Sequence, residues 1–333
     1  MKNSNYSILF AGGGTGGHLY PALAVADELK RRHRSASIRF IGAERGIETR
    51  LVPEAGYVLQ TLRLHGMKGA SAGGKLKATF AAALAVLVCC ATMLGSRPDL
   101  VIGVGGYASG PAVLAARLLL VRTMILEQNH FPGATNRWLA GWVNRICVPS
   151  EAARVRFGNR GEVTGNPVRA NFTRIGEPPL AERLSILVFG GSRGARSINT
   201  AMVAAAAGLA ALPVPPSIVH QTGEKDLETV SDRYRSYPGG LATASAYLDD
   251  MADRLARADF VISRAGATTL AELAAAGRGA LLIPYPHASD NHQLQNAQAV
   301  EEAGGARIIP DRDLDGEGIV KLIADCLLYT SPS

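Results

Sequence analysis

The stretch SILFAGGGTGGH, residues 7–18, decides the fold. Five uncharged residues lead into a glycine-rich turn, and a helix-compatible segment follows. This pattern predicts a strand, a tight turn and a helix, with the glycine amides pointing toward an anion at the positive end of the helix. The stretch SILVFGGSRGA, residues 185–195, repeats the pattern in the second half of the chain. Two such stretches in one chain predict two nucleotide-binding domains that face each other across a cleft.

Composition indicates an ordinary globular protein. The 333 residues suffice for two cores, and 47% are hydrophobic and 19% charged. The four cysteines show no metal-binding spacing, and a polar stretch follows Met1, so we expect reduced thiols and no secretory signal. The net charge of +7 favours anionic partners such as phosphates or acidic lipid. Nucleic acid is disfavoured as a partner because aromatic residues are few and no Lys/Arg run is interleaved with them.

Apolar segments alternate with helical ones along the whole chain, which predicts an α/β fold with parallel sheets. We expect strands near residues 6–11, 36–41, 57–62, 100–104, 123–127, 145–148, 185–189, 217–221, 241–245, 259–263 and 280–283. Turn residues at 165–167 and 176–179 predict a domain junction. Residues 328–333 break off without the pattern of a closing helix, and we expect a truncation there.

The segment from Ala78 to Ser96 carries no charge and approaches the length of a membrane span, roughly 20 residues. Alanine dominates it, however, and its larger apolar residues form one helical stripe. These are Phe80, Leu84, Leu87, Ala91 and Leu94. The pattern therefore favours a buried or surface-docking helix over a span.

The first glycine loop has two interpretations. Gly12, Gly14 and Gly17 satisfy G-x-G-x-x-G, and Glu44 ends the next predicted strand, where it could bind the ribose of NAD. A second phosphate-type loop has no place in a simple dehydrogenase, which disfavours NAD. A third loop, residues 103–111, is either a tight turn before a helix, with Pro111 in its first turn, or a second wall of the anion site.

His18 stands where the first loop becomes a helix. It is either a solvated residue at the helix start or a general base. The positive end of a helix disfavours imidazolium and keeps the ring neutral, able to accept a proton near pH 7.

In the second half, the predicted strand 259–263 leads into RAGATTLAE, residues 264–272. Small residues let a diphosphate approach the helix start, Thr268 and Thr269 add hydroxyl donors, and Glu272 can accept hydrogen bonds from a ribose diol. The alternative is a capped helix with an early acidic residue. The polar run 290–293 suits sugar hydroxyls, or a helix N-cap at Asp290. No Asp-x-Asp lies beside a phosphate loop, because 249–250 and 311–313 are expected at the surface.

Together these residues resemble the MurG family, the bacterial glycosyltransferases that add N-acetylglucosamine to lipid I to make lipid II. The matching segments follow in order over nearly the whole chain: residues 13–18, 105–111, 127–129, 165–169, 190–192, 248–251 and 264–272. The resemblance implies a GT-B fold, in which two Rossmann-like domains with parallel sheets face a central cleft. Residues 1–165 would form the acceptor and membrane-docking domain, and residues 166–333 the domain that binds UDP-N-acetylglucosamine.

The resemblance also implies an inverting transfer to the muramic acid 4-hydroxyl, without a cofactor or a metal. The implied catalytic residue is His18. The implied donor-binding residues are Thr15, Gly16, Gly17, Asn129, Arg169, Ser192, Leu248, Ala267, Thr268, Thr269, Leu270, Ala271, Glu272 and Gln293. The implied acceptor-binding residues are Gly14, His18, Gly105, Gly106 and Tyr107. Leu126 and Arg193 depart from the family pattern, which often has histidine and glutamine there.

A lipid-linked acceptor implies a peripheral protein at the cytoplasmic face of the bacterial cell membrane. The apolar stripe of residues 80–94, with Lys68, Lys75 and Lys77 beside it, predicts docking on an anionic leaflet. Other functions stay open from the residues alone. They are a GT-B epimerase, a transferase with another acceptor, and a nucleotide-sugar-binding protein without turnover.

Overall fold

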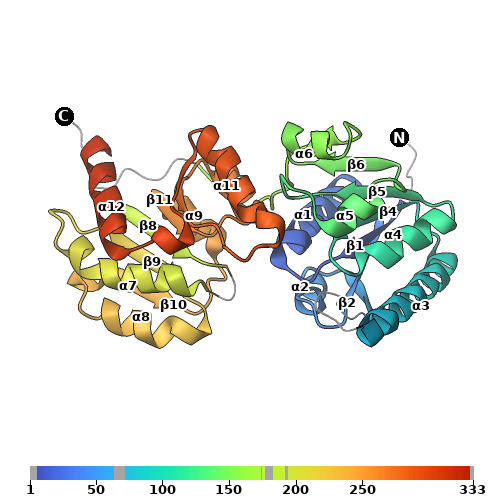
Figure 1. The fold of residues 1–333 in the computed structure, drawn as a ribbon, viewed down its shortest axis with the longest axis horizontal. Helices are drawn as coiled ribbons and strands as arrows, with labels where there is room; N and C mark the ends of the chain where they lie inside the picture. Colours follow the sequence, from blue (N-terminus) through green and yellow to red (C-terminus); the bar gives the residue numbers. More distant parts are fainter. Residues whose placement is uncertain (1–5, 64–71, 174, 177–182, 192–193, 331–333) are drawn as a thin grey trace. The chain divides into compact units, whose positions relative to one another are not determined.

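The computed structural model describes residues 6–63, 72–173, 175–176, 183–191 and 194–330 (Figure 1). The chain divides into two compact units, Met1–Arg169 and Ala170–Ser333. The sequence placed this division after residue 165. The turn that follows stays with the first unit, because the guanidinium of Arg169 lies 4.3 Å from the ring centroid of Tyr20.

The N-terminal unit is built on a seven-stranded parallel sheet with the order β3-β2-β1-β4-β5-β6-β7. Its strands are β1 (Ser7–Gly12), β2 (Ser37–Ala43), β3 (Val58–Leu62), β4 (Leu100–Gly105), β5 (Arg122–Leu126), β6 (Arg145–Val148) and β7 (Glu162–Val163). Its helices are α1 (Gly16–Arg32), α2 (Glu48–Glu54), α3 (Ala72–Ser96), α4 (Ser109–Leu118), α5 (Ala134–Leu139) and α6 (Glu151–Arg156).

The central strands are apolar throughout because both faces of the sheet are covered. In β1, Leu9 packs into one hydrophobic core and Phe10 into the core on the opposite face. Every strand predicted in this unit is present within two residues of its expected bounds. The two-residue strand β7 was not predicted, because so short a segment carries no periodic pattern.

The C-terminal unit holds a six-stranded parallel sheet with the order β10-β9-β8-β11-β12-β13. Its strands are β8 (Ser185–Phe189), β9 (Ser217–Gln221), β10 (Ala242–Ser245), β11 (Phe260–Ser263), β12 (Gly279–Leu282) and β13 (Ala306–Ile308). Its helices are α7 (Arg196–Ala210), α8 (Leu227–Tyr234), α9 (Met251–Arg257), α10 (Ala267–Ala276), α11 (His292–Glu302) and α12 (Gly316–Thr330), with a 3-10 turn η4 (Asp311–Asp313). The five predicted strands are confirmed, and β13 was missed.

The expectation that the chain lacks a closing helix was wrong as far as Thr330. Helix α12 reaches that residue, and its Ile319 and Ile323 are fully buried in the core of the C-terminal unit. It packs closely on α7, since a Cβ at Gly208 would lie 2.8 Å from the side chain of Val320.

Helix α3 lies beside α4 on the N-terminal unit (Figure 1). Its buried face consists of Ala85, Cys89 and Met93. The predicted apolar stripe lies on the other side, where the side chains of Phe80, Leu84, Leu87 and Leu94 are 53–73% exposed. A helix lying wholly in the core is therefore excluded. Within the described residues, no helix is both long and apolar enough to cross a membrane.

Candidate functional site

In both sheets, the order of the strands reverses next to the first strand of the unit. The order reverses between β1 and β4 in the N-terminal unit and between β8 and β11 in the C-terminal unit. In open α/β sheets, ligands bind beyond the carboxyl ends of the strands at such a switch point. The predicted loops at 12–17, 105–110, 190–195 and 264–267 follow these four strands. The topology therefore places these loops at the positions where open α/β sheets bind ligands.

Three helices begin at these loops without a side-chain cap. The N-cap residues of α1, α7 and α10, which are Thr15, Ala195 and Gly266, make no side-chain capping hydrogen bond. The first amides of a helix have no partner within it, and the helix dipole favours negative charge there. Each of these helix starts can therefore receive an anionic group of a ligand.

The first glycine loop is partly tied up inside the protein. The amide of Gly13 donates to the carbonyl of Gly105 at 3.3 Å, and the amide of Gly14 donates to Glu48 Oε2 at 2.8 Å. The expectation that the amides of this loop point toward an anion is thus wrong for Gly13 and Gly14. An anion at this helix must therefore bind amides other than those of Gly13 and Gly14.

His18 lies at the start of α1, half-buried against the third glycine loop. Its Nδ1 lies 3.3 Å from the carbonyl oxygen of Gly13 and 3.3 Å from Thr15 Oγ1. A Cβ at Gly105 would lie 3.0 Å from His18 Nε2, a tight contact, and the φ of +93° at this position also favours glycine. Because a carbonyl only accepts, the contact with Gly13 is a hydrogen bond when Nδ1 carries the proton. That tautomer puts the lone pair on Nε2.

The loops at 12–17 and 105–106 meet directly. A Cβ at Gly106 would lie 2.5 Å from the carbonyl oxygen of Gly13. The structure thus brings together four predicted acceptor residues, Gly14, His18, Gly105 and Gly106. Tyr107 follows with its side chain 59% exposed.

A buried carboxylate shapes the loop that carries Asn129. Glu127 is 1% exposed, and its Oε1 accepts hydrogen bonds from the Gln128 amide (3.0 Å), the Asn129 amide (2.9 Å) and Asn129 Nδ2 (3.1 Å). Its Oε2 accepts from the Gly133 amide (3.0 Å) and Asn136 Nδ2 (2.9 Å). Asn129 is therefore held by Glu127. Glu127 belongs to the predicted motif 127–129, but the sequence does not indicate that it holds Asn129.

In the C-terminal unit, the helix that follows β11 carries most of the predicted donor residues. Helix α10 starts at Ala267 after Gly266, whose extended backbone (φ −69°, ψ 140°) ends the loop. Thr268 and Leu270 are buried, whereas Ala267, Thr269, Ala271 and Glu272 are partly exposed. The acidic Glu272 lies in the second turn of the helix, beyond the capping position. The capped-helix alternative is thus disfavoured for Glu272.

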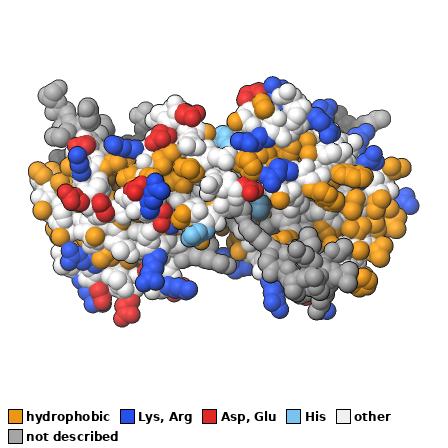
Figure 2. Space-filling model, viewed as in Figure 1, with side chains coloured by type: hydrophobic (Ala, Val, Ile, Leu, Met, Phe, Trp, Pro, Cys, Tyr) orange, Lys and Arg blue, Asp and Glu red, His pale blue; other side chains and the backbone are white. Residues whose placement is uncertain are grey.

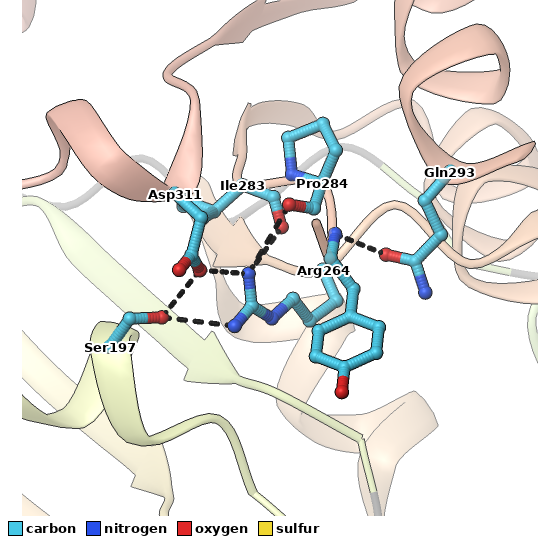
Figure 3. A network of polar contacts seen from close by, with 7 residues as sticks. Ser197, Arg264, Ile283, Pro284, Gln293 and Asp311 are labelled. Atoms are coloured by element: carbon cyan, nitrogen blue, oxygen red, sulfur yellow. Dashed lines mark hydrogen bonds and ion pairs between the residues drawn. The ribbon is translucent and has the colours of Figure 1, made fainter. Parts of the chain in front are cut away.

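Arg264 fixes the start of this loop (Figure 3). Its guanidinium donates to the carbonyl oxygens of Ile283 (3.1 Å) and Pro284 (3.4 Å), to Ser197 Oγ (2.9 Å) and to the carboxylate of Asp311. Ser197 in turn donates to Asp311 at 2.6 Å. This network joins the ends of β11 and β12 to the start of α7 and to η4. Asp311, expected at the surface, is instead part of it.

Leu248 and Gln293 are each held in place by a hydrogen bond between a backbone amide and a glutamine side chain. The amide of Leu248 donates to Gln221 Oε1 at 2.9 Å, and Gln221 Nε2 donates to the carbonyl of Gly191 at 2.9 Å. Gln293 Oε1 accepts from the amide of Tyr285 at 2.9 Å. Gln221 escaped sequence reasoning because it is an ordinary polar residue at the end of a buried strand. Ser192 and Arg193 lie outside the described residues.

Helix α11 begins after Asn291, not after Asp290 as one interpretation expected. Glu44, the candidate NAD ribose ligand, forms an exposed ion pair with Arg63 at 3.3 Å. Among the described residues, no three His, Cys, Asp or Glu side chains are grouped so that they could hold a metal ion.

Comparisons with known proteins cover both units. The Glycosyltransferase family 28 N-terminal domain matches residues 8–148, and the Glycosyltransferase family 28 C-terminal domain matches residues 185–331. A Myxococcus xanthus (strain DK1622) protein, UDP-N-acetylglucosamine--N-acetylmuramyl-(pentapeptide) pyrophosphoryl-undecaprenol N-acetylglucosamine transferase, is 44% identical over 323 residues. The alignment covers 96% of this chain and 84% of that protein.

Two solved structures separate fold from family. The crystal structure of Acinetobacter baumannii MurG matches with a TM-score of 0.79 and 30% identity, over 97% of this chain and 91% of that one. A UDP-GlcNAc 2-epimerase from Neisseria meningitidis matches with a TM-score of 0.66 but 12% identity, over 98% and 92%, which shows a common fold alone. The expected GT-B class is confirmed, and the epimerase alternative is not favoured. The chain therefore belongs to glycosyltransferase family 28 and, within it, to the MurG family of N-acetylglucosamine transferases.

Proposed function

We propose that this enzyme transfers N-acetylglucosamine, with inversion, from UDP-N-acetylglucosamine to the muramic acid 4-hydroxyl of lipid I, giving lipid II. One observation carries this proposal, the 44% identity over 96% of the chain with a transferase named for this reaction. The arrangement of the site supports it, because ligand-binding loops stand at the switch point of both sheets. The donor and the lipid-linked acceptor are its two substrates.

The C-terminal unit would bind the donor. The start of α10 offers backbone amides and the positive end of a helix to the diphosphate. Glu272, one turn further on, accepts hydrogen bonds from the ribose hydroxyls. Because the amide of Leu248 is already donated to Gln221, its carbonyl oxygen is the backbone atom that accepts from uracil N3–H. The remaining donor residues are Thr15, Gly16, Gly17, Asn129, Arg169, Ser192, Ala267, Thr268, Thr269, Leu270, Ala271 and Gln293.

The N-terminal unit would bind the acceptor at Gly14, His18, Gly105, Gly106 and Tyr107. When Nδ1 carries the proton and donates it to the carbonyl of Gly13, His18 presents a basic Nε2. Nε2 takes the proton of the 4-hydroxyl as the hydroxyl oxygen bonds to C1 of the sugar. The bond between C1 and the diphosphate oxygen breaks on the opposite face, and UDP departs with the electron pair. The helix starts stabilise the charge that develops on the UDP.

We also infer that the N-terminal unit docks on the cytoplasmic face of the cell membrane. Exposed apolar side chains gather over α3 and α4, as Figure 2 shows. The α3 stripe, defined as Phe80, Leu84, Leu87 and Leu94, would enter the interface between headgroups and acyl chains. Lys75 and Lys77 precede the stripe in the sequence and would meet anionic headgroups, while Lys68 lies outside the described residues.

One assay tests the reaction and its alternatives. UDP release from UDP-N-acetylglucosamine is measured with and without a soluble lipid I analogue. We expect release to depend on the analogue and to yield the disaccharide product. Release without the acceptor, accompanied by a change at C2 of the sugar, would indicate an epimerase instead. Binding of the donor without any release would indicate a protein that binds nucleotide sugars without turnover.

A further inference from the structure

The N-terminal unit contains a buried carboxylate outside the set of predicted site residues. Glu48 is the first residue of α2 and is 1% exposed. Its Oε1 accepts from the amide of Ala43 at 2.8 Å, and its Oε2 accepts from the amide of Gly14 at 2.8 Å. Burying a carboxylate is costly unless hydrogen bonds compensate it, so these two bonds hold the charge in place.

The three glycines packed around the Glu48 side chain leave no room for a Cβ atom at their positions. A Cβ at Gly13 would lie 2.6 Å from the carboxyl carbon, and a Cβ at Gly46 would lie 2.0 Å from Oε2. A Cβ at Gly42 would lie 2.5 Å from Cγ. These three glycines thus surround the carboxylate closely. This packing fixes the position of the carboxylate against the first glycine loop.

The bond to Gly14 leads directly to His18. The amide N–H of Gly14 and the carbonyl of Gly13 belong to one planar peptide group. On one side this group donates to Glu48 Oε2 at 2.8 Å, and on the other its oxygen lies 3.3 Å from His18 Nδ1. Consecutive hydrogen bonds polarise one another, so a negative charge at the N–H end makes the carbonyl oxygen a better acceptor.

We propose that Glu48 is a positioning residue for His18 and acts through the Gly13–Gly14 peptide group. The carboxylate orients the peptide, and the peptide carbonyl holds the proton of His18 on Nδ1. Nε2 is then the nitrogen with the lone pair. In serine hydrolases a carboxylate contacts the imidazole directly to fix its tautomer; here one peptide group stands between them. The proposal rests on the role of His18 as base given above.

The test reads the tautomer of His18 by NMR, independently of activity. The seven histidines are labelled with ¹⁵N, and the His18 signals are identified by their loss in His18→Gln. In the wild-type enzyme above the titration range of the ring, we expect a protonated Nδ1 and an unprotonated Nε2. In Glu48→Gln we expect a substantial population protonated on Nε2. The control is Glu54→Gln, an exposed glutamate on the same helix, which should leave the tautomer unchanged.

Kinetics give the second readout. Glu48→Gln should lower kcat by about 10- to 100-fold, typical for loss of a group that orients a reacting residue, with the KM for donor and the affinity for UDP within about twofold. A wild-type His18 protonated on Nε2 would overturn the proposal, as would an unchanged tautomer in folded Glu48→Gln. If that variant does not fold, the wild-type tautomer alone decides. If the tautomer depends on Glu48 but His18→Ala keeps its kcat, the positioning role stands and the base assignment fails.

Discussion

Glu272 projects from the second turn of α10, where its partly exposed carboxylate can reach a ribose that lies beside the helix start. Hydrogen bonds to a charged group contribute about 1.5–3 kcal/mol, which corresponds to about 10- to 100-fold in affinity. We therefore expect Glu272→Ala to weaken UDP binding by that factor in calorimetry. Glu302→Ala, an exposed glutamate on α11, is the matched control. Unchanged affinity for UDP in Glu272→Ala would remove this residue from the donor site.

His18 should act on the acceptor and not on the donor. A positioned base contributes about 10²–10⁴-fold, so we expect His18→Ala to lower kcat by that factor and to leave the affinity for UDP almost unchanged. His33→Ala, at the other end of α1 and exposed, should behave as wild type. A variant that loses UDP binding but keeps its kcat would make His18 a donor ligand.

His220 makes the stability of the C-terminal unit dependent on pH. The ring is fully buried between Tyr234, whose hydroxyl lies 3.0 Å from Nδ1, and Asn199, whose Oδ1 lies 3.0 Å from Nε2. Burial lowers the pKa of His220 to about 3, from about 6.5 in the unfolded chain. Between these values the unfolded state binds a proton that the folded state does not. The contribution of neutral His220 to the free energy of unfolding is therefore complete above pH 6.5 and is lost as the pH falls toward 3.

The measurement is urea unfolding between pH 7 and 4.5. His220 should contribute a loss of up to about 1.4 kcal/mol per pH unit below pH 6.5. His220→Gln should be less stable than wild type at pH 7, with a shallower decline toward acid. Equal slopes in the two proteins would show that His220 titrates normally in the folded state.

At the level of elements, the sequence predicted the strands well but left open whether the apolar stripe of α3 faces the core or the surface. Strands buried on both faces read as continuous apolar runs, so their positions follow from composition alone. Both faces of α3 are apolar, and the pattern does not say which of them meets the core. The small and flexible residues Ala85, Cys89 and Met93 face the alanines of α4, while the bulkier stripe faces outward. The packing between α3 and α4 determines which face is buried, and a local sequence pattern does not contain this information.

The exposed stripe leads to a prediction about membrane binding. Each basic residue near an anionic leaflet contributes about 1 kcal/mol, screened over about 8–10 Å, and inserted apolar side chains add a part that salt does not screen. We expect co-sedimentation with anionic liposomes that weakens with salt and is released by carbonate. Lys75→Glu/Lys77→Glu and, separately, Phe80→Ser/Leu84→Ser should reduce it.

The control for the charge change is Lys225→Glu/Lys321→Glu, two exposed lysines of the C-terminal unit. This variant should bind liposomes as the wild type does. An enzyme that ignores anionic vesicles at low salt would refute docking, and one that resists the carbonate wash would be inserted more deeply than a docked helix.

At the scale of the whole molecule, the sequence predicts those parts of the site whose residues are contiguous in the chain. The glycine loops and RAGATTLAE stand at the strand ends because the order of parallel strands brings them there. The groups that fix these loops come from distant positions: Glu48 reaches Gly14 across 34 residues, Gln221 reaches Leu248 across 27, and Asp311 reaches Arg264 across 47. Each is an ordinary polar residue in its own segment. Only the tertiary fold reveals its partner.

The distribution of charge over the whole enzyme leads to the last prediction, which concerns metal dependence. Departing UDP carries negative charge that must be stabilised in the transition state. We propose that the starts of α1, α7 and α10 serve this purpose, because the side chains of their N-cap residues make no capping hydrogen bond. Of the acidic pairs, Asp311 is engaged by Arg264, and Asp250 forms an ion pair with Arg254 at 2.9 Å. We therefore expect turnover to persist in EDTA with an unchanged kcat. Near-complete loss of turnover in EDTA, restored by Mg²⁺, would mean that a cation and not the helix starts balances the charge on UDP.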